Sequence, residues 1–309
     1  MVVARADPSE REQDADREEG NRRRQRGGGE PRDVDGGRGD PRSAERDTAE
    51  ELIVHGPSGF GAADSAPPDG SSNTFPAMAT ELTWLGHSAF RVESPGGKRI
   101  YVDPFLHGNP SCPESELEPE RCDLVIVTHG HGDHTGDTVA IHERFDCPVV
   151  AQVELRAWLT GQGVADDGMA HSPNKGGTLA VAGVKITLTD GNHSSSTPDG
   201  TYAGESCGVV LELEGGFKIY FAGDTNVFGD MSLIGRIYSP DVAVLPIGDH
   251  FTMGPREAAV ALELLGVVRC VPCHYGTFPL LSGTPDALRA LAPPGVEVLS
   301  PEPGETLAL

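Results

Sequence analysis

The hydrophobic pattern of the chain changes sharply at about residue 78. From there to residue 309, short apolar runs rich in β-branched residues alternate with turn signals and with segments of amphipathic helical period. The first strands follow one another closely and the later ones alternate with helices, which predicts a layered α/β sandwich. The predicted strands lie near 81–85, 89–93, 98–103, 123–128, 148–151, 184–189, 207–213, 217–222, 241–246, 268–272 and 296–299. The predicted helices lie near 135–144, 153–162, 230–237, 255–265 and 284–291.

Residues 1–77 show no such periodicity. They contain 11 arginines and 17 acidic residues, few aromatic residues, and clusters such as Arg22-Arg-Arg24. A segment of this composition cannot bury enough apolar surface to offset the entropy of ordering it, which predicts disorder. A sharper hypothesis is that the extension is spurious and that Met78, which leads directly into the first predicted strand, is the true start. The predicted domains are therefore the extension, 1–77, and one globular domain, 78–309.

The charge balance is strongly acidic. The formal net charge is −23, of which −6 falls in residues 1–77, and only four lysines are present. Salt screens the self-repulsion of such a surface, because the Debye length falls to about 3 Å at 1 M. This predicts a halophilic protein from a salt-rich cytoplasm, and the competing interpretation is an ordinary acidic protein from a GC-rich genome. The same charge makes nucleic acid an unexpected partner.

Cysteine usage and hydropathy narrow the class further. Six cysteines are spread irregularly over the chain, which favours reduced thiols over a disulfide framework. The amino terminus lacks an apolar signal core, and no apolar run reaches the ~18 residues that a membrane helix needs. We therefore expect a cytoplasmic protein without a membrane partner. The sequence does not indicate an oligomeric state.

The densest candidate chemistry is the loop His129-Gly-His-Gly-Asp133-His134. Side chains alternate in an extended segment, so His129, His131 and Asp133 are expected to point the same way. The intervening glycines let the backbone approach closely whatever these groups hold. Imidazoles and carboxylates are ligands of borderline divalent metals such as zinc, and four candidates exceed the need of one tetrahedral ion. The loop therefore predicts a site for two metal ions.

Three candidate partners for this loop occur later in the chain. Each follows directly on the carboxyl end of a predicted strand, and they are His193, Asp224 and His274. In layered α/β folds, loops at that edge of the sheets carry functional groups. The alternative is a chance histidine-rich surface loop, but three candidate ligands from separate segments at the same edge favour a metal site.

These motifs, in this order, resemble the metallo-β-lactamase superfamily. Further segments resemble a narrower group of metal-dependent hydrolases that is related to the L-ascorbate-6-phosphate lactonases. They are Trp84-Leu-Gly-His-Ser-Ala-Phe90, Asp103-Pro-Phe105, Tyr202-Ala-Gly-Glu205, Leu245-Pro-Ile-Gly248 and Phe251-Thr-Met-Gly-Pro255. The resemblance covers essentially all of residues 78–309. It implies an αββα four-layer sandwich with the metal ions in a cleft at one edge of the two sheets.

The resemblance also implies a role for each candidate ligand. The first ion would be held by three imidazoles, those of His129, His131 and His193. The second would be held by Asp133, His134 and His274. Asp224 would bridge both. The ions are expected to be Zn²⁺, although the same ligands serve Mn²⁺ or Fe²⁺.

Three residues are candidates for catalytic roles besides metal binding, and a fourth for a supporting role. His87 and His250 lie in segments that match the narrower group, and either is a candidate to polarise a substrate oxygen. Asp133 or His250 is a candidate to carry a proton to the leaving group. Asp103 either belongs to a simple turn or accepts a hydrogen bond from the far nitrogen of a ligand imidazole. A purely structural role is the competing interpretation of each lone histidine.

The segment Cys270-Val-Pro-Cys273-His274 has the form of a c-type haem attachment site. Covalent haem would take His274 as its axial ligand and leave the other six candidate ligands without their seventh member. It would also require export of the chain. We therefore interpret Cys270 and Cys273 as small buried hydrophobic residues.

The sequence therefore predicts an enzyme, a dinuclear metal-dependent hydrolase. Metal-bound hydroxide would attack a small-molecule substrate, namely an ester, a lactone or a phosphorylated sugar acid. The alternatives are a phosphodiesterase acting on nucleotides or RNA ends and an iron redox protein on the same scaffold. The acidic surface disfavours the RNA substrate, and flavodiiron relatives usually carry Glu where His131 stands, which disfavours the redox protein. A non-catalytic binding protein is least favoured, because all seven ligand positions are filled.

Overall fold

The computed structural model describes residues 79–309 of the chain. The predictions made for residues 1–77, and for Met78 as the true start, lie outside these residues. None of the helices in the described part of the chain has both the length and the apolar character needed to cross a bilayer.

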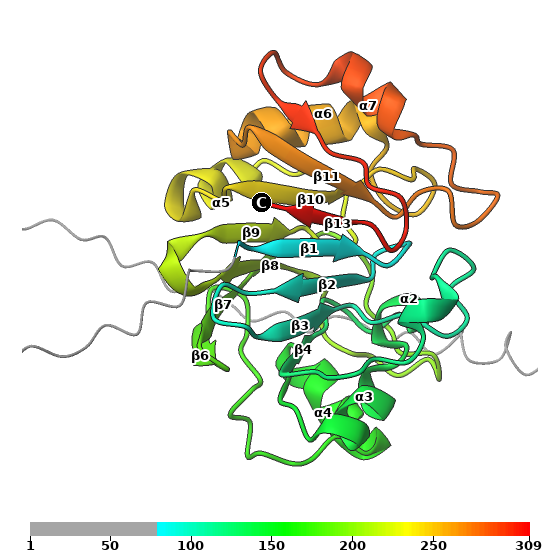
Figure 1. Ribbon diagram of the computed structural model, residues 1–309, viewed down its shortest axis with the longest axis vertical. Helices are drawn as coiled ribbons and strands as arrows, with labels where there is room; N and C mark the ends of the chain where they lie inside the picture. The colour runs from blue at the N-terminus through cyan, green and yellow to red at the C-terminus, as the bar shows by residue number, and fades with distance from the viewer. Residues whose placement is uncertain (1–78) are drawn as a thin grey trace, which may run out of the picture. The chain divides into compact units, whose positions relative to one another are not determined.

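Two mixed β-sheets make up the centre of the fold (Figure 1). In order across the six-stranded sheet, the strands are β13 (Thr306–Ala308), β1 (Glu81–Trp84), β2 (Phe90–Glu93), β3 (Arg99–Val102), β4 (Leu124–Ile126) and β5 (Val149–Val150). In order across the seven-stranded sheet, they are β12 (Glu297–Val298), β11 (Arg269–Cys273), β10 (Val242–Pro246), β9 (Lys218–Phe221), β8 (Cys207–Glu212), β7 (Val184–Asp190) and β6 (Thr178–Val181). Strands β3 to β5 pair in parallel, as do β9 to β12, and the remaining pairs are antiparallel.

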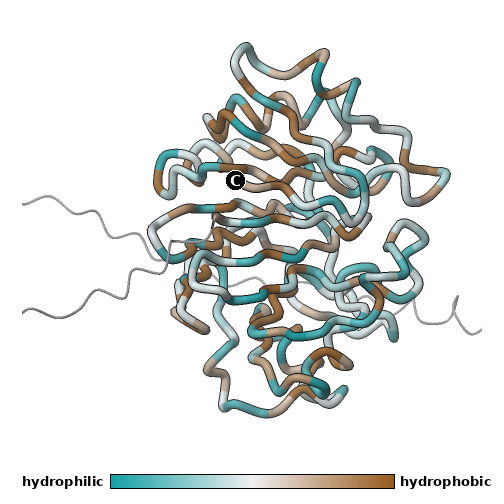
Figure 2. Tube along the Cα trace, in the orientation of Figure 1, coloured by the Kyte–Doolittle hydropathy of each residue, from teal (hydrophilic) through white to brown (hydrophobic). Residues whose placement is uncertain are grey.

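Side chains of the central strands alternate between two apolar layers. In β9, Ile219 and Phe221 face the layer between the sheets, whereas Tyr220 faces the layer outside. In β4, Val125 likewise faces outward while its neighbours face the other sheet. Hydrophobic segments therefore run through both sheets, as Figure 2 shows. Burial on both faces explains why these strands are continuously apolar in the sequence and do not alternate with polar residues.

Helices cover the outer face of each sheet. The helices on the six-stranded sheet are α3 (Thr138–Phe145) and α4 (Val153–Gln162), and those on the seven-stranded sheet are α5 (Met231–Tyr238), α6 (Pro255–Leu265) and α7 (Pro285–Leu291). Ile141 and Leu155 pack the helices onto the six-stranded sheet, and Leu262 and Leu288 pack the helices onto the seven-stranded sheet. The order of layers is helix, sheet, sheet, helix (Figure 1). The predicted αββα four-layer sandwich is confirmed.

Two short strands are absent from the prediction. Strand β6 is an edge strand in which exposed and half-buried residues alternate, so its apolar signal is weak. Strand β13 has three residues and pairs with β1, so that Leu82 lies opposite Leu307. Such a pairing across nearly the whole domain depends on the tertiary fold, because three residues carry little pattern of their own.

The predicted helix 135–144 is wrong at its start. The structure has a single turn, α2 (Gly132–Thr135), followed by α3, and the two are separated at Gly136. A Cβ atom at Gly136 would lie 2.7 Å from the carbonyl oxygen of Pro104. The backbone N–H of Asp137 donates to that same oxygen at 2.7 Å. The chain therefore bends where it packs against the Pro104 segment, a contact that helical periodicity does not report.

The carboxyl ends of the parallel strands meet at one edge of the sandwich. Strand β4 leads into residues 129–134, β9 leads to Asp224, and β11 leads to His274. The two sheets are joined there, because the carbonyl oxygen of Thr128 accepts hydrogen bonds from the backbone N–H of Cys207 at 3.2 Å and from its Sγ at 3.0 Å. Loops from both sheets are thus brought to one place.

Candidate metal centre

Histidine and aspartate side chains from distant parts of the sequence converge at this edge. Three groups have potential ligand atoms within 4.8 Å of one another. They are His129, His131 and His193; His129, His134 and Asp224; and His87, Asp133, His134 and His274. Shared members join the groups into one site, which contains all seven ligand candidates of the sequence analysis together with His87.

Asp224 lies at the centre of this site and is almost fully buried. The imidazole Nε2 atoms around its Oδ2 atom belong to His274 at 3.0 Å, His134 at 3.4 Å, His193 at 3.7 Å and His129 at 4.0 Å. Gly223 precedes it with φ of 61°, and a Cβ atom there would lie 2.8 Å from the carbonyl oxygen of Cys207. Only glycine fits this close approach, which delivers Asp224 between imidazoles from both sheets.

The loop after β4 is not extended throughout, so the expectation that Asp133 points the same way as His131 is wrong. His131 has extended backbone angles (φ −64°, ψ 150°) and precedes the first residue of α2. The chain then turns helical, and Asp133 Oδ2 comes to lie 2.9 Å from His87 Nε2. His129 Nε2 and His131 Nδ1 stay together, 3.0 Å apart. One helical turn therefore divides the ligands of a single loop between two groups.

Gly130 lets the loop that carries His193 pack against the loop that carries His129. A Cβ atom at Gly130 would lie 2.8 Å from the Cβ atom of Ala203. The backbone N–H of Gly130 also donates to the Ser195 hydroxyl at 3.1 Å. This close approach places His193 beside His129, with ring centroids 5.3 Å apart.

A buried carboxylate orients the imidazole of His134. Its Nδ1 atom lies 2.8 Å from Asp103 Oδ2, so Nδ1–H donates and Nε2 is the nitrogen that faces Asp224. Asp103 also accepts hydrogen bonds from the backbone N–H of Thr128 at 2.8 Å and from its hydroxyl at 2.7 Å. Of the two hypotheses for Asp103, the structure supports the one in which it accepts a hydrogen bond from an imidazole.

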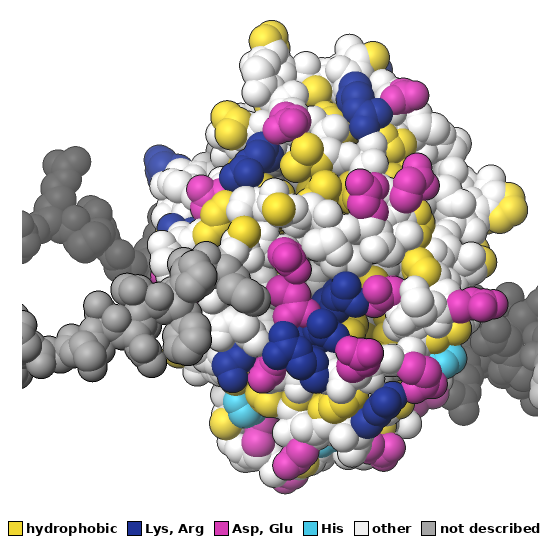
Figure 3. Space-filling model, viewed as in Figure 1, with side chains coloured by type: hydrophobic (Ala, Val, Ile, Leu, Met, Phe, Trp, Pro, Cys, Tyr) yellow, Lys and Arg dark blue, Asp and Glu magenta, His cyan; other side chains and the backbone are white. Residues whose placement is uncertain are grey.

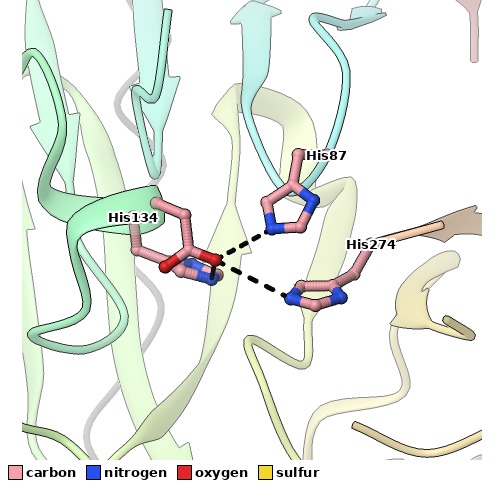
Figure 4. Close-up of side chains that lie close together, drawn as sticks. His87, His134 and His274 are labelled. Carbon is pink, nitrogen blue, oxygen red and sulfur yellow. Dashed lines mark hydrogen bonds and ion pairs between the residues drawn. The ribbon is translucent and has the colours of Figure 1, made fainter. Parts of the chain in front are cut away.

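His87 lies inside the second group of ligands. Figure 4 shows His87, His134 and His274 directed at one carboxylate. That carboxylate is Asp133, whose Oδ2 atom lies 2.9 Å from His87 Nε2 and 4.0 Å from the Nε2 atoms of the other two. His87 and His274 both have φ of 54°, and the backbone N–H of His274 donates to the His87 carbonyl at 2.9 Å. Non-glycine residues in this region are held by their surroundings and cluster at functional sites.

Burial lowers the pKa of most imidazoles in the site. They are those of His87, His129, His131 and His193. His134 differs: burial opposes its charge, but Asp224 and Asp103 raise its pKa well above the usual value. Burial likewise opposes the charge of Asp224, but His134 and His274 hold its pKa well below the usual value. Metal ligation needs a free lone pair on each imidazole, so a divalent cation bound beside Asp224 would displace the extra proton from His134.

Unpartnered atoms at the centre of the site test whether a metal ion fits. Among the described residues, His134 Nε2 and Asp224 Oδ1 are buried and have no hydrogen-bond partner. A buried polar atom without a partner costs about 1–3 kcal/mol. Imidazole nitrogen and carboxylate oxygen are usual ligands of divalent ions, so such an ion would satisfy both atoms. The residues present therefore fit a metal centre.

A cavity of about 590 Å³ opens onto this site. Its polar wall consists of His131, Asp133, His193, Ser194, Asp224 and His274. Its apolar wall consists of Phe251, Phe278, Pro279 and Leu280. Small-molecule sites commonly have volumes of about 300–1,000 Å³, so the cavity offers room for a small ligand beside the candidate ligands.

Two candidate catalytic residues are not brought to the cavity wall. His250 is exposed, packs edge-on against Phe251 with ring centroids 4.5 Å apart, and is not among the residues that line the cavity. His87 is fully buried behind Asp133 and does not line the cavity either. Of the three candidate catalytic residues, Asp133 therefore lines the cavity, and His87 and His250 do not.

The two cysteines of the haem-like motif lie in different apolar layers. Cys270 packs between the seven-stranded sheet and its helices, whereas Cys273 packs between the two sheets. Both belong to β11, where residues three positions apart point to opposite faces. The prediction that they are small buried hydrophobic residues is confirmed.

Sequence reasoning missed the apolar wall of the cavity. A signal was present, because Phe278-Pro-Leu-Leu281 is an apolar run in a loop with no periodicity of its own. It was not recognised, because nothing local tells an apolar loop that lines a cavity from one that packs on a core. Ser194 was also missed, although it directly follows His193 and its hydroxyl lies 3.4 Å from His131 Nε2.

The chain is similar to several known proteins. Residues 98–275 match the family model described as a β-lactamase superfamily domain. The chain is 50% identical over 215 residues to a UPF0173 metal-dependent hydrolase of Herpetosiphon aurantiacus, over 68% of this chain and 89% of the relative. It is 50% identical over 211 residues to one of Rubrobacter xylanophilus, over 67% of this chain and 86% of the relative. Among solved structures, Igni18, a metallo hydrolase from the archaeon Ignicoccus hospitalis, is 36% identical with a TM-score of 0.64, over 74% of this chain and 98% of that one.

Proposed function

The chain belongs to the β-lactamase superfamily and is a metal-dependent hydrolase, and we propose that it uses a pair of divalent ions to hydrolyse a small ester, a lactone or a phosphorylated sugar acid. The observation that carries the proposal is the convergence of seven candidate ligands, with Asp224 at their centre, beside a cavity of about 590 Å³. Two groups of imidazoles on either side of one carboxylate offer more donor atoms than a single ion needs.

Each proposed ion has its own ligand set. The first would be held by His129, His131 and His193. The second would be held by Asp133, His134 and His274. Asp224 would be shared, since its Oδ2 atom lies within 4.0 Å of imidazoles in both sets. Zinc suits this set of imidazoles and carboxylates, and manganese or iron would accept it too.

Divalent ions bound there would supply Lewis acidity and make water nucleophilic at neutral pH. The residues of the chain hold and orient the groups involved. Asp103 fixes the tautomer of His134, so that Nε2 presents its lone pair. The apolar wall, with Phe251 and Phe278, excludes solvent from one side of the cavity. Exclusion of water strengthens every electrostatic interaction inside.

We assign proton transfer to Asp133. Its carboxylate lines the cavity, and His87 Nε2 donates to Oδ2 at 2.9 Å. Burial would raise the pKa of Asp133, but the hydrogen bond from His87 and the nearby His134 lower it below the usual value, so the group is ionised at neutral pH. Besides holding the second ion, this ionised carboxylate would pass a proton from the attacking water to the leaving group. His87 then acts as a positioning residue, and His250 has no contact with the cavity.

A small molecule is favoured over nucleic acid as the substrate. On the face in Figure 3, Lys and Arg side chains gather over β2 and β3, interleaved with Asp and Glu. Arg91 pairs with Glu116, and both Arg99 and Arg121 pair with Glu93. Phosphate backbones are bound by cationic groups that are free to replace counterions, and these guanidinium groups are engaged by carboxylates.

Metal analysis and a substrate panel test the proposal. We expect about two metal ions per chain by elemental analysis, and hydrolysis of p-nitrophenyl esters or lactones that is lost with a chelator and restored with Zn²⁺. Asp224→Ala should lower the rate more than about 100-fold. Asp230→Ala is the matched control, because Asp230 is exposed and makes no side-chain hydrogen bond as the N-cap of α5. Full metal loading without hydrolysis of any substrate in the panel would favour the alternative hypothesis of an iron redox protein.

A further inference from the structure

We infer that the substrate carries an uncharged apolar group, alkyl or aryl, which binds against a hydrophobic rim at the mouth of the metal-site cavity. The hydrophobic rim is the apolar wall described above and consists of Phe251, Phe278, Pro279 and Leu280. The inference rests on the proposed hydrolase function and narrows its substrate class: it selects esters and lactones with apolar substituents and excludes the phosphorylated sugar acid.

The first part of the rim is held rigidly from behind. Phe251 is 50% exposed at the tip of a turn that begins at Asp249. The turn is closed by the backbone N–H of Asp249, which donates to the carbonyl of Met253 at 3.2 Å. Met253 is fully buried, and its own N–H donates to the carbonyl of Thr225 at 3.0 Å, directly after Asp224. The backbone of the turn that carries Phe251 is therefore tied to the residue next to Asp224.

The second part of the rim is held in the same way. Leu281 is buried and its backbone N–H donates to the carbonyl of Phe278 at 3.0 Å, which leaves Leu280 56% exposed at the tip of the loop. The ring of Phe278 packs edge-on against His87 with centroids 5.2 Å apart. The two parts of the rim are thus attached to Thr225, next to Asp224, and to His87.

The cavity wall offers no cationic side chain to an anionic substituent. None of the described residues that line the cavity is Lys or Arg, and the acidic residues that line it, Asp133 and Asp224, are candidate metal ligands. A phosphate or carboxylate bound away from the reacting centre would find no cation there and would face the hydrophobic rim. Burial of an unpaired charge against apolar side chains is strongly unfavourable. An alkyl or aryl group, in contrast, gains free energy from the area that it buries.

Esters of increasing acyl length test this inference on the metal-loaded full chain. For p-nitrophenyl acetate, butyrate and hexanoate, we expect kcat/KM to rise about two- to fourfold per added methylene. An ester of hexanoate length with a terminal carboxylate should lose this gain. Phe251→Ala and Leu280→Ala should flatten the dependence on chain length, and Leu280→Lys should shift the preference toward the anionic ester. Ile237→Ala is the matched control, because Ile237 is 62% exposed on α5, away from the cavity wall.

Binding provides a readout that does not require turnover. Alkyl hydroxamic acids from two to eight carbons, titrated calorimetrically into the same metal-loaded protein, should show Kd falling about two- to fourfold per methylene until the rim is covered. The rim variants should reduce this slope and Ile237→Ala should not.

The outcomes separate the two proposals. Ester hydrolysis with no dependence on chain length, or with a preference for the anionic ester, overturns the apolar-substrate inference and leaves the hydrolase proposal intact. Absence of ester and lactone hydrolysis together with chain-dependent hydroxamate binding overturns the reaction proposed here and supports the apolar rim. If the Kd of the hydroxamates for the wild type does not depend on chain length, that result alone overturns the inference that the hydrophobic rim binds the substrate.

Discussion

Replacement of Asp103 by Asn tests how the fold prepares His134 to bind a metal ion. Asp103 is 2% exposed, and its Oδ2 atom accepts the Nδ1–H of His134 at 2.8 Å. In the variant, the amide nitrogen is a donor and cannot accept that proton. The tautomer with the proton on Nε2 then becomes favourable, and this proton points at Asp224. Asn tolerates the positive φ of 48° found here, so the backbone should persist.

The structure sets the size of the expected effects. Loss of a carboxylate that orients a ligand imidazole typically costs 10–100-fold in metal affinity, which is about 1.4–2.7 kcal/mol. The metal-free variant should lose about 1–3 kcal/mol of folding free energy, since one buried charge-assisted hydrogen bond is removed. The Asn carbonyl can still accept from the backbone N–H of Thr128, which Asp103 binds at 2.8 Å. Asp103→Ala leaves that N–H unpaired and should be the more destabilising of the two.

Competition with a chromophoric chelator measures the metal affinity, and thermal unfolding of the metal-free chain measures the stability. Asp123→Asn is the matched control: Asp123 accepts a backbone N–H from Arg99 at 2.9 Å, at the other end of β4. It should leave metal affinity unchanged. If Asp103→Asn binds zinc as tightly and in the same amount as the wild type, the argument that Asp103 sets the tautomer of His134 is refuted.

Four further predictions follow from other parts of the structure. His193→Ala should remove about one metal equivalent by elemental analysis, because His193 belongs to one proposed ligand set. Asp224→Ala, at the shared position, should weaken the binding of both metal ions. Equal losses of metal from the two variants would contradict the proposed ligand sets. Gly130→Ala should lower the free energy of unfolding in urea by about 1–3 kcal/mol, because the new methyl group would lie 2.8 Å from Ala203 Cβ. A urea midpoint equal to that of the wild type would show that the two loops separate easily. Burial, and to a smaller extent the charges of Glu116 and Asp137, raise the pKa of Cys112 to about 12. Iodoacetamide should therefore alkylate Cys112 at pH 8 several hundredfold more slowly than a free thiol, and the rate should rise about tenfold per pH unit. Fast alkylation at pH 8 would contradict this prediction. The melting temperature should rise with KCl up to about 2 M if the acidic surface is salt-adapted, and a constant value would favour an ordinary acidic protein.

Contiguous residues were sufficient to predict much of the architecture. Helices α4 (Val153–Gln162) and α6 (Pro255–Leu265) lie at the predicted positions, because amphipathic period and a proline in the first turn are properties of neighbouring residues. The central strands were equally visible, since burial on both faces leaves a continuous apolar run. Local sequence also predicts the seven candidate ligands, because each lies in a loop that follows the carboxyl end of a strand.

The tertiary structure decided what depends on contacts between distant segments. It divided one loop between two ligand groups, because the chain turns helical after His131 and carries Asp133 to His87, 46 positions away in the sequence. It paired His134 with Asp103 across 31 positions. It also turned Phe251 and Leu280, from separate loops, into one cavity wall. Sequence alone determined which residues could do chemistry and which edge of the fold would hold them. Their grouping, tautomers and substrate-facing surroundings depend on packing between elements that no local pattern records, because side-chain direction at a turn is set by the neighbours it meets.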